Sequence, residues 1–355
     1  MRASLADLRA RRRDGSILLA TWNIRDLGAT KFNPAPRTDE AFLYLAEILS
    51  SFDLVALQEV NFHLGDFTRL VGHLGPGWDY IVTDAKTTDG GNDERMAFVF
   101  NRDKLWFDHV AGEIVLPQGQ LIMPAAAVKP PDAQTEEEAA LVAAMTETDP
   151  DVPAGTAATG QQFARTPFVV SFQAGWFRFN LCTVHIYYGS ETGQKLQRRI
   201  DEIKALVKFF AQRQDRENRN VTPQRAQNYI LLGDFNVVSP EHKTMKALRS
   251  RGFTVPEQID GAAFPDRSHF YDQIAVRVRD PRFKVLDGGM VDMYQDVFTD
   301  DDVGLYIDRI KPDRRKSDLQ RFRNWRTWQM SDHQPLWVEI HTDFSDDYLR
   351  DFAAP

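Results

Sequence analysis

The stretch YILLGDFNVVSP, Tyr229 to Pro240, contains an apolar run that stops abruptly at Gly233. A short apolar run that ends at a glycine is typical of a buried β-strand. Asp234 and Asn236 follow directly, and side chains two positions apart in an extended segment lie on the same face. The pattern therefore predicts a strand whose end presents a carboxylate and a carboxamide to the same point.

Polar residues also stand at the ends of other strand-like runs along the chain. They are Asn23 after 17–22, Gln58 and Glu59 after 53–57, Glu94 and Arg95 before 96–100, His185 after 176–184, Asp272 in 270–278, and Asp332 and His333 before 336–340. Carboxylates that converge at one rim repel one another unless a cation lies between them. Asp, Glu and Asn oxygens favour a hard ion, so we expect Mg²⁺, with Mn²⁺ or Ca²⁺ as alternatives, rather than Zn²⁺.

Helical patterns alternate with these strands. Thr38 and Asp39 are typical of a helix start, and apolar residues recur at helical spacing from Phe42 to Leu49. A longer helix is expected from Ser190 to Phe210, and a β-hairpin over 168–185. The strands are too many for one doubly wound sheet, which favours an α/β sandwich of two sheets with helices outside.

A single catalytic domain is expected over 15–342, with terminal extensions at 1–14 and 343–355. Residues 117–162 are rich in Ala, Pro and acids, which is typical of a surface insertion. Within it, the acidic run that follows Thr135 predicts a cap for a short helix over 139–145.

Composition restricts the function classes only loosely. The chain has 355 residues, of which 43% are hydrophobic, so it can bury a sizeable core. One cysteine, Cys182, cannot form an internal disulfide, and no run approaches the roughly 20 apolar residues of a membrane span. We therefore expect a soluble, cytoplasmic protein without stable membrane association, whose oligomeric state the sequence does not indicate.

The net charge of −8 argues against a uniformly basic nucleic-acid-binding surface. A local basic patch can still steer a polyanion. Residues 309–328 form such a patch, because Arg and Lys alternate there with aromatic residues that include Trp325. The segment suits a phosphate backbone and stacked bases, and the alternative is a solvated loop whose tryptophans pack on the core.

Five short motifs carry a family resemblance. In chain order they are ATWNI (20–24), LQEV (57–60), GDFN (233–236), YDQI (271–274) and SDHQP (331–335). They resemble the successive motifs of the endonuclease/exonuclease/phosphatase superfamily and span nearly the whole chain. The resemblance implies a four-layer α/β/β/α sandwich of two mixed, largely antiparallel sheets flanked by helices, which hydrolyses phosphate esters with a divalent metal.

Three further segments are similar to the deoxyribonuclease I-like branch of this superfamily. They are NDERMAF (92–98), TVH (183–185) and RTPFV (165–169). The resemblance implies that Glu94 orients His185, which protonates the leaving group, and that Arg165 grips a phosphate oxygen. Arg95 is the alternative phosphate contact, or a salt-bridge partner of Glu94.

The resemblance also implies roles for the remaining rim residues. Glu59 is expected as the main metal ligand, with Asn23 and Asp332 nearby or bridging through water. We expect His333, oriented by Asp272, to act as a base or to stabilise the phosphate. Asp234 and Asn236 are expected to contact the phosphate and its attacking water, with Asp234 accepting a proton or aligning the water. Trp325 is expected to contribute to substrate binding because it lies in the basic aromatic segment 309–328.

These expectations favour a metal-dependent nuclease that cleaves DNA by attack of water on a backbone phosphate. A phosphatase or lipid phosphodiesterase on the same scaffold is the alternative, acting on a phosphoinositide, sphingomyelin or a sugar phosphate. A catalytically silent nucleic-acid or partner-binding module is the third reading.

Overall fold

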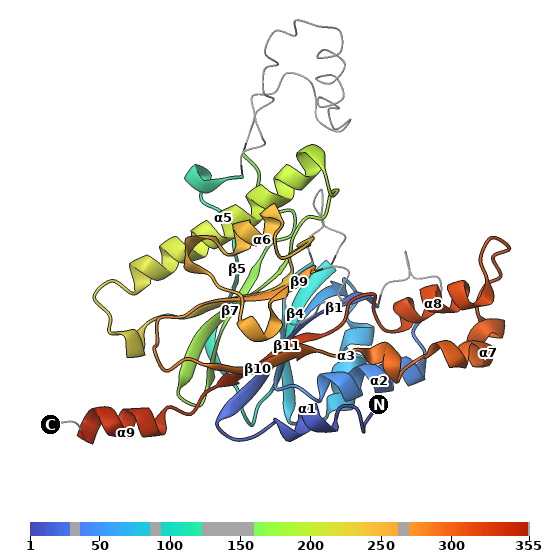
Figure 1. Ribbon diagram of the computed structural model, residues 1–355, viewed down its shortest axis with the longest axis horizontal. Coiled ribbons are helices and arrows are strands. Elements are labelled where there is room, and N and C mark those ends of the chain that lie inside the picture. Colours follow the sequence, from blue (N-terminus) through green and yellow to red (C-terminus); the bar gives the residue numbers. More distant parts are fainter. Residues whose placement is uncertain (29–35, 86–93, 123–159, 262–269, 354–355) are drawn as a thin grey trace, which may run out of the picture.

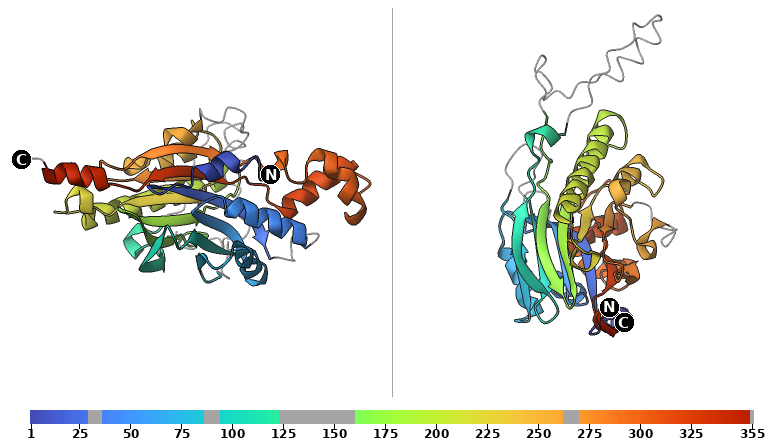
Figure 2. Two further views of the ribbon diagram at one scale, coloured as in Figure 1. Left: turned by 90° about the horizontal axis from the view of Figure 1, so that it is seen from below. Right: turned by 90° about the vertical axis from the view of Figure 1, so that its left-hand side faces the viewer.

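Two β-sheets form the centre of the computed structural model, which describes residues 1–28, 36–85, 94–122, 160–261 and 270–353. Sheet A has six strands and sheet B has five (Figure 1; Figure 2). In spatial order, sheet A comprises β10 (Val285–Met290), β11 (Leu336–His341), β1 (Ser16–Leu27), β2 (Leu54–Asn61), β4 (Glu94–Asn101) and β3 (Trp78–Val82). Sheet B comprises β5 (Trp106–Glu113), β6 (Phe168–Ala174), β7 (Phe177–His185), β8 (Tyr229–Asp234) and β9 (Asp272–Arg277).

Helices cover the outer faces of both sheets and confirm the predicted four-layer sandwich. Figure 1 shows α5 and α6 on the side of sheet B and α2 and α3 on the side of sheet A. The helices are α1 (Ala6–Ala10), α2 (Asp39–Leu49), α3 (Gly65–Leu74), α5 (Gly193–Glu217), α6 (Lys243–Leu248), α7 (Val303–Tyr306), α8 (Asp318–Gln329) and α9 (Ser345–Ala353). None of the described helices is long and apolar enough to cross a membrane.

The alternation of side chains in β1 explains how the layers adhere. Ile17 and Leu19 lie in the core between the sheets, whereas Leu18 and Ala20 lie in a second core with α2. A strand that is buried on both faces requires a continuous apolar run, and β1 has one. The predicted apolar face of α2 packs in the second core, and Thr38 caps that helix by accepting a hydrogen bond from the Ala41 amide.

Strand β8, on which the fold prediction was based, lies inside sheet B with both faces buried. It pairs parallel to β7 and antiparallel to β9, so that Asp234 stands opposite both His185 and Asp272. Gly233 adopts φ +133°, and a Cβ there would lie 2.1 Å from the carbonyl oxygen of Val184. Only glycine allows β8 to approach β7 so closely, and the register brings three polar side chains together.

Several local predictions differ from the structure. Strands β3, β5 and β10 were not predicted, and all three carry half-buried or exposed side chains that weaken the apolar pattern. The long helix begins at Gly193 rather than Ser190, whose hydroxyl instead donates a hydrogen bond to the carbonyl of Thr192. The expected helix at 139–145 and most of the 117–162 insertion lie outside the described residues.

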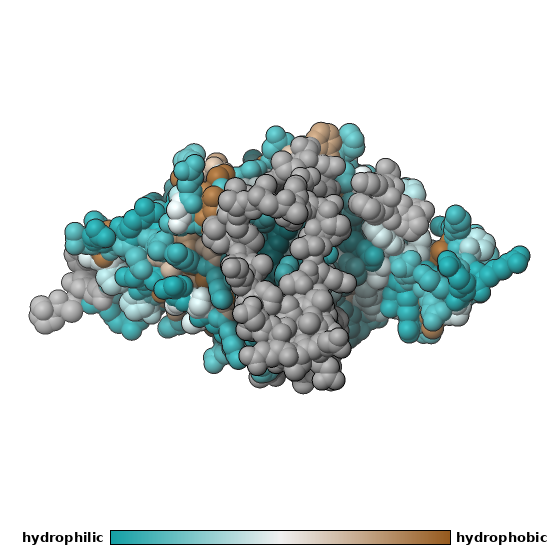
Figure 3. Space-filling view, turned by 90° about the horizontal axis from the view of Figure 1, so that it is seen from above, coloured by the Kyte–Doolittle hydropathy of each residue, from teal (hydrophilic) through white to brown (hydrophobic). Residues whose placement is uncertain are grey.

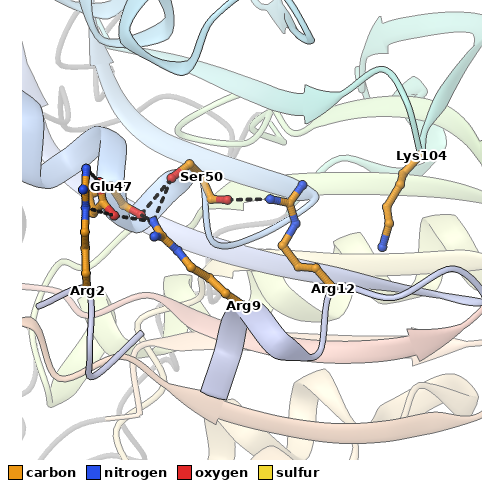
Figure 4. A pocket seen from close by; sticks show the side chains of 6 residues that line it. All are labelled: Arg2, Arg9, Arg12, Glu47, Ser50 and Lys104. Carbon is orange, nitrogen blue, oxygen red and sulfur yellow. Dashed lines mark hydrogen bonds and ion pairs between the residues drawn. The ribbon is translucent and has the colours of Figure 1, made fainter. Parts of the chain in front are cut away.

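The first fourteen residues, expected to form an extension, pack on the sandwich. Leu5 and Leu8 are buried in the core beside α2. Figure 4 shows Arg9 and Arg12 reaching from this segment to the end of α2, where Arg12 donates to the Ser50 carbonyl over 2.9 Å. Asp53, just after that helix, is fully buried and accepts hydrogen bonds from Arg12 Nε (2.9 Å), Lys104 Nζ (3.3 Å) and the Leu18 amide (2.9 Å).

We expect Asp53→Ala to lower the free energy of unfolding by about 2–4 kcal/mol, because it leaves two cations and a buried amide without their acceptor. Chemical denaturation of the two proteins measures the difference. Glu113→Ala, at an exposed carboxylate on β5, serves as the control and should change stability by no more than about 0.5 kcal/mol. Equal stability of the two variants would contradict the anchoring role of Asp53.

Candidate active site

The rim of the sandwich departs from regular sheet geometry where β1 and β2 of sheet A run side by side. The pairing register shifts between Asn23 and Leu27, and Arg25, Asp26 and Glu59 have φ angles of +53°, +52° and +60°. Such bulges change the direction in which side chains point. They are held by local bonds, since Asn23 Oδ1 accepts from the Arg25 amide (3.0 Å) and Glu59 Oε2 from the Asp26 amide (3.1 Å).

Asn23 connects the two sheets at this rim. Its amide nitrogen donates to Glu59 Oε1 over 2.8 Å and to Asp234 Oδ2 over 3.3 Å. Glu59 belongs to sheet A and Asp234 to sheet B, so one carboxamide links carboxylates that are 175 positions apart in the chain. The predicted convergence of Asn23, Glu59 and Asp234 is therefore present in the structure.

Asp234 lies between two imidazoles. Its Oδ2 is 3.6 Å from Nε2 of His185 and 3.9 Å from Nε2 of His333. Burial alone would raise the pKa of Asp234, but His333 and His185 outweigh burial and lower it. Asp234 is thus a buried carboxylate whose charge two imidazoles stabilise.

His185 is held from behind by Glu94. Its Nδ1 lies 2.9 Å from Glu94 Oε1, and Arg165 forms an ion pair with the same carboxylate. Burial would raise the pKa of Glu94, but His185 and Arg165 outweigh it and lower that pKa. Burial and Arg165 oppose a charge on His185, yet Glu94 prevails and raises the pKa of the imidazole. Nε2 of His185 is left facing Asp234.

His333 forms the second imidazole–carboxylate pair, with Nδ1 2.8 Å from Asp272 Oδ2. The loop that carries it is fixed to β1, since Trp22 Nε1 donates to the His333 carbonyl (3.0 Å) and Ser331 Oγ to the Asn23 carbonyl (2.6 Å). Burial opposes a charge on His333, but Asp272 outweighs it and raises the pKa of His333 to about 10. In the metal-free protein this imidazole is therefore protonated at neutral pH.

The donor set around Glu59 suits a hard divalent ion. Ligand atoms of Glu59, Glu94 and His185 lie within 4.8 Å of one another. Glu94 is already balanced by Arg165 and His185, whereas burial raises the pKa of Glu59 and the nearest His185 nitrogen is 3.9 Å away. A carboxylate with 26% of its side chain exposed and so little compensating charge fits a cation beside it. Asn23 would have to turn its oxygen toward that cation and give up the bond from the Arg25 amide.

The structure turns two of the expected site residues elsewhere. Asp332 is 49% exposed and lies 3.4 Å from Arg25, so it faces that guanidinium rather than Glu59. Asn236 has φ +51°, and its amide nitrogen donates to the Ile186 carbonyl over 2.8 Å. The prediction that Asp234 and Asn236 share a face was wrong, because the chain is not extended at Asn236. Asp234 instead caps this turn by accepting from the Asn236 amide (2.9 Å).

The two arginines expected to contact the phosphate lie in different surroundings. Arg165 lies at the rim on Glu94, whereas Arg95 donates to the Thr83 carbonyl over 2.7 Å and pairs with Asp84. Arg95 thus points away from Glu94, as consecutive residues of a strand do.

Trp325 requires a correction, because its side chain is only 4% exposed. It packs against Phe298, Tyr306 and Phe322 with ring centroids 5.1–5.9 Å apart. The indole therefore cannot stack on a base in this structure, and the core-packing alternative for this tryptophan holds.

Sequence reasoning missed several residues that shape the site. Arg37 is buried and donates to the carbonyls of Ile24, Arg25 and Gln329, which ties the bulged end of β1 to the end of α8. Tyr271 lies 6.0 Å from the His333 ring. The sequence gives no spacing that identifies a buried arginine such as Arg37, which donates to backbone carbonyls. For Tyr271 the sequence did hold a signal, because this residue directly precedes Asp272.

Comparison with known proteins agrees with the fold. A sequence model of the Endonuclease/Exonuclease/phosphatase family matches residues 20–333. Similar solved structures include the catalytic domain of human Nocturnin with bound sulfate (TM-score 0.52, 15% identity, 92% of this chain and 95% of that one). Another is an endonuclease/exonuclease/phosphatase family protein from Bacteroides thetaiotaomicron (TM-score 0.51, 19% identity, 94% and 100%). No curated protein matches the sequence significantly.

The His333 pair leads to a prediction for the metal-free protein. The folded-state pKa of about 10 lies above the ordinary value of 6.5. The pair thus contributes its full stabilisation below pH 6.5 and loses it as the pH rises from 6.5 toward 10. NMR titration with a chelator present should show His333 protonated at pH 7.5 in wild type, and titrating at clearly lower pH in Asp272→Asn. Indistinguishable titrations would contradict the assigned pairing.

Proposed function

This chain belongs to the endonuclease/exonuclease/phosphatase family of metal-dependent phosphoric ester hydrolases, and we propose that it cleaves phosphodiester bonds of DNA. The observation that carries the proposal is the placement of two imidazoles on either side of Asp234, at 3.6 and 3.9 Å. Each imidazole is held on its other nitrogen by a buried carboxylate. Two imidazoles held in this way suit a reaction at phosphorus, because one can donate to a phosphoryl oxygen and the other can protonate the oxygen that leaves.

Hydrolysis of a phosphodiester needs an aligned water, relief of charge on the phosphoryl oxygens and a proton for the leaving oxygen. Asp234 keeps its charge because its pKa is lowered, so it can align the attacking water by accepting a hydrogen bond and then take the proton that this water loses. His333, protonated at neutral pH, can stabilise a phosphoryl oxygen. Of the two roles expected for this residue, its pKa favours phosphate stabilisation over that of a base in the metal-free protein.

His185 is the proposed donor of the leaving-group proton. Glu94 raises its pKa and fixes Nδ1, so that Nε2 carries the proton on the side of Asp234. Arg165 acts through Glu94, because its Nε is engaged with that carboxylate. Arg165 thus positions His185 and adds positive charge near the phosphate.

Glu59 would hold the divalent ion, with Asn23 beside it once its carboxamide turns. When bound, Mg²⁺, Mn²⁺ or Ca²⁺ would supply charge relief on the phosphate and a lower pKa for a coordinated water. Asp332 remains available to hold a bridging water, although its carboxylate lies 3.4 Å from the Arg25 guanidinium.

DNA is favoured over monoesters and lipids by the basic segment that precedes Ser331 in an otherwise acidic chain. An assay matrix of supercoiled plasmid, single-stranded DNA, RNA and a panel of phosphate monoesters, each with Mg²⁺, Mn²⁺, Ca²⁺ or EDTA, tests the proposal. We expect plasmid cleavage that needs metal and stops in EDTA. Phosphate release from monoesters with intact plasmid would instead support the phosphatase alternative.

The proposed roles predict the behaviour of single variants in the same assay. Removing the proton donor with His185→Ala, or the water-aligning carboxylate with Asp234→Asn, should reduce kcat by about 10²–10⁴-fold. His109→Ala, at an exposed histidine on β5, is the control and should keep wild-type activity. Circular dichroism confirms folding of each variant. Wild-type rates for a folded His185→Ala enzyme would remove His185 from the chemistry.

A further inference from the structure

A strongly basic loop lies at the far end of α8 from the site. Residues 309–316 contain five basic residues and one acid, Asp313, in a chain whose net charge is −8. We call residues 309–316 the basic loop. Figure 1 shows α7 and α8 projecting from the body, and Figure 3 shows the same lobe on the right with a mostly hydrophilic surface.

Four cations of the basic loop are exposed, and none of them has an ion-pair partner among the described residues. They are Arg309, Lys311, Arg314 and Lys316. Arg315, the fifth, is 3.3 Å from Asp313. Unpaired cations gathered at one place raise the local potential and attract a polyanion, even when the rest of the surface repels it.

The basic loop is held in place rather than left loose. Arg321, in the first turns of α8, donates to the carbonyls of Ile310 (2.6 Å) and Lys311 (3.3 Å). Ser317 and Gln320 close a capping box, with bonds of 3.2 and 3.0 Å between each side chain and the other's amide. The four free cations are therefore presented on a pre-organised backbone, which lowers the entropic cost of binding.

The other end of α8 is fixed to the catalytic rim. The carbonyl of Gln329 accepts from Arg37 Nε (3.2 Å), and its side chain accepts from the Thr38 amide (2.8 Å). His333 follows four residues later. Helix α8 has 12 residues, so at 1.5 Å per residue it separates the basic loop from the rim by about 18 Å.

We infer that the basic loop binds the backbone of a polynucleotide substrate about five nucleotides from the phosphate being cleaved. The inference rests on the proposed function. Successive phosphates of one strand of B-form DNA are spaced about 3.4 Å along the helix axis, so an extent of about 18 Å along that axis corresponds to about five nucleotides. No small diester or phosphate monoester spans that distance, so a substrate that contacts the basic loop and the rim at once must be a polymer.

An anionic membrane is the competing partner for such a loop. Membrane-binding segments combine basic residues with apolar or aromatic side chains that enter the lipid. Across residues 299–329, the exposed large hydrophobic side chain is Leu305 alone. A surface so poor in apolar groups fits a polyanion that is bound by charge.

The test compares two charge-matched double variants. Arg314→Ala with Lys316→Ala removes two cations of the basic loop, and Arg216→Ala with Arg219→Ala removes two exposed arginines at the remote end of α5. Steady-state kinetics use a 30-base-pair DNA duplex and the small diester bis(4-nitrophenyl) phosphate, over a range of KCl concentrations with Mg²⁺ present.

We expect the loop variant to raise KM for the duplex by about tenfold at 0.1 M salt, with kcat unchanged. Its plot of log(kcat/KM) against log[KCl] should be shallower by about 2, one for each lost phosphate contact. Turnover of the small diester should equal that of wild type, and the control variant should match wild type on both substrates.

Other outcomes count against the inference in separable ways. An unchanged KM and salt slope in the loop variant, or an equal loss in the control, overturns it while the proposed function stands. A further outcome is that the protein sediments with phosphatidylcholine–phosphatidylserine vesicles only when the basic loop is intact, while the KM for the duplex does not change. That result overturns the inference and identifies an anionic membrane as the partner of the loop. Hydrolysis of the small diester by wild type with no cleavage of any polynucleotide removes the DNA proposal itself.

Discussion

Polar contacts between the two sheets hold the catalytic rim together. Asn23 of sheet A reaches Asp234 of sheet B, and Gln58 of sheet A donates to Thr183 of sheet B over 2.8 Å. The two imidazole–carboxylate pairs cross the same boundary, since Glu94 and the loop before β11 belong to one layer, and His185 and Asp272 to the other. At the rim, the contacts that position the two imidazoles therefore also join the two sheets, in addition to the apolar core between them, so the geometry of the site depends on how the sheets pack.

Glu59 is the exception in this network. Asp234, Asp272 and Glu94 each have an imidazole within reach, but the close partners of Glu59 are two uncharged donors, the Asn23 carboxamide at 2.8 Å and the Asp26 amide at 3.1 Å, and His185 is 3.9 Å away. It is also held at φ +60°, which costs free energy for any residue with a side chain. Strain of this kind persists only where the surrounding structure imposes it, and here both carboxylate oxygens are fixed. The least compensated carboxylate of the rim is thus held in a constrained backbone conformation, as a preformed cation site requires.

Apolar periodicity and the order of the motifs were sufficient to predict the buried strands and the family of the chain. Buried strands such as β1 and β8 were found because both of their faces are apolar, and the register then brought Asp234, His185 and Asp272 together. Periodicity fails where side chains are half exposed, as in β10, whose Asp287 and two glycines conceal the strand. It also cannot show a positive φ, which is why Asn236 was placed on the wrong face. Helix α8 was not predicted, although the sequence contains a signal for its start. Ser317 and Gln320 have the spacing of a capping box.

Distance determines what the basic loop and the rim can do to each other. The Debye length at physiological ionic strength is about 8 Å, roughly half the length of α8. Charges on Arg314 and Lys316 are therefore screened from His333 and cannot tune its pKa. Any influence of the basic loop on turnover must pass through a molecule that contacts both places at once. Such a molecule gains binding energy far from the reacting phosphorus, and this energy affects capture of the substrate more than the chemical step. In the proposed arrangement, α8 separates the loop that binds the polymer from the rim that cleaves it, and Arg321 and Arg37 fix the two ends of this helix.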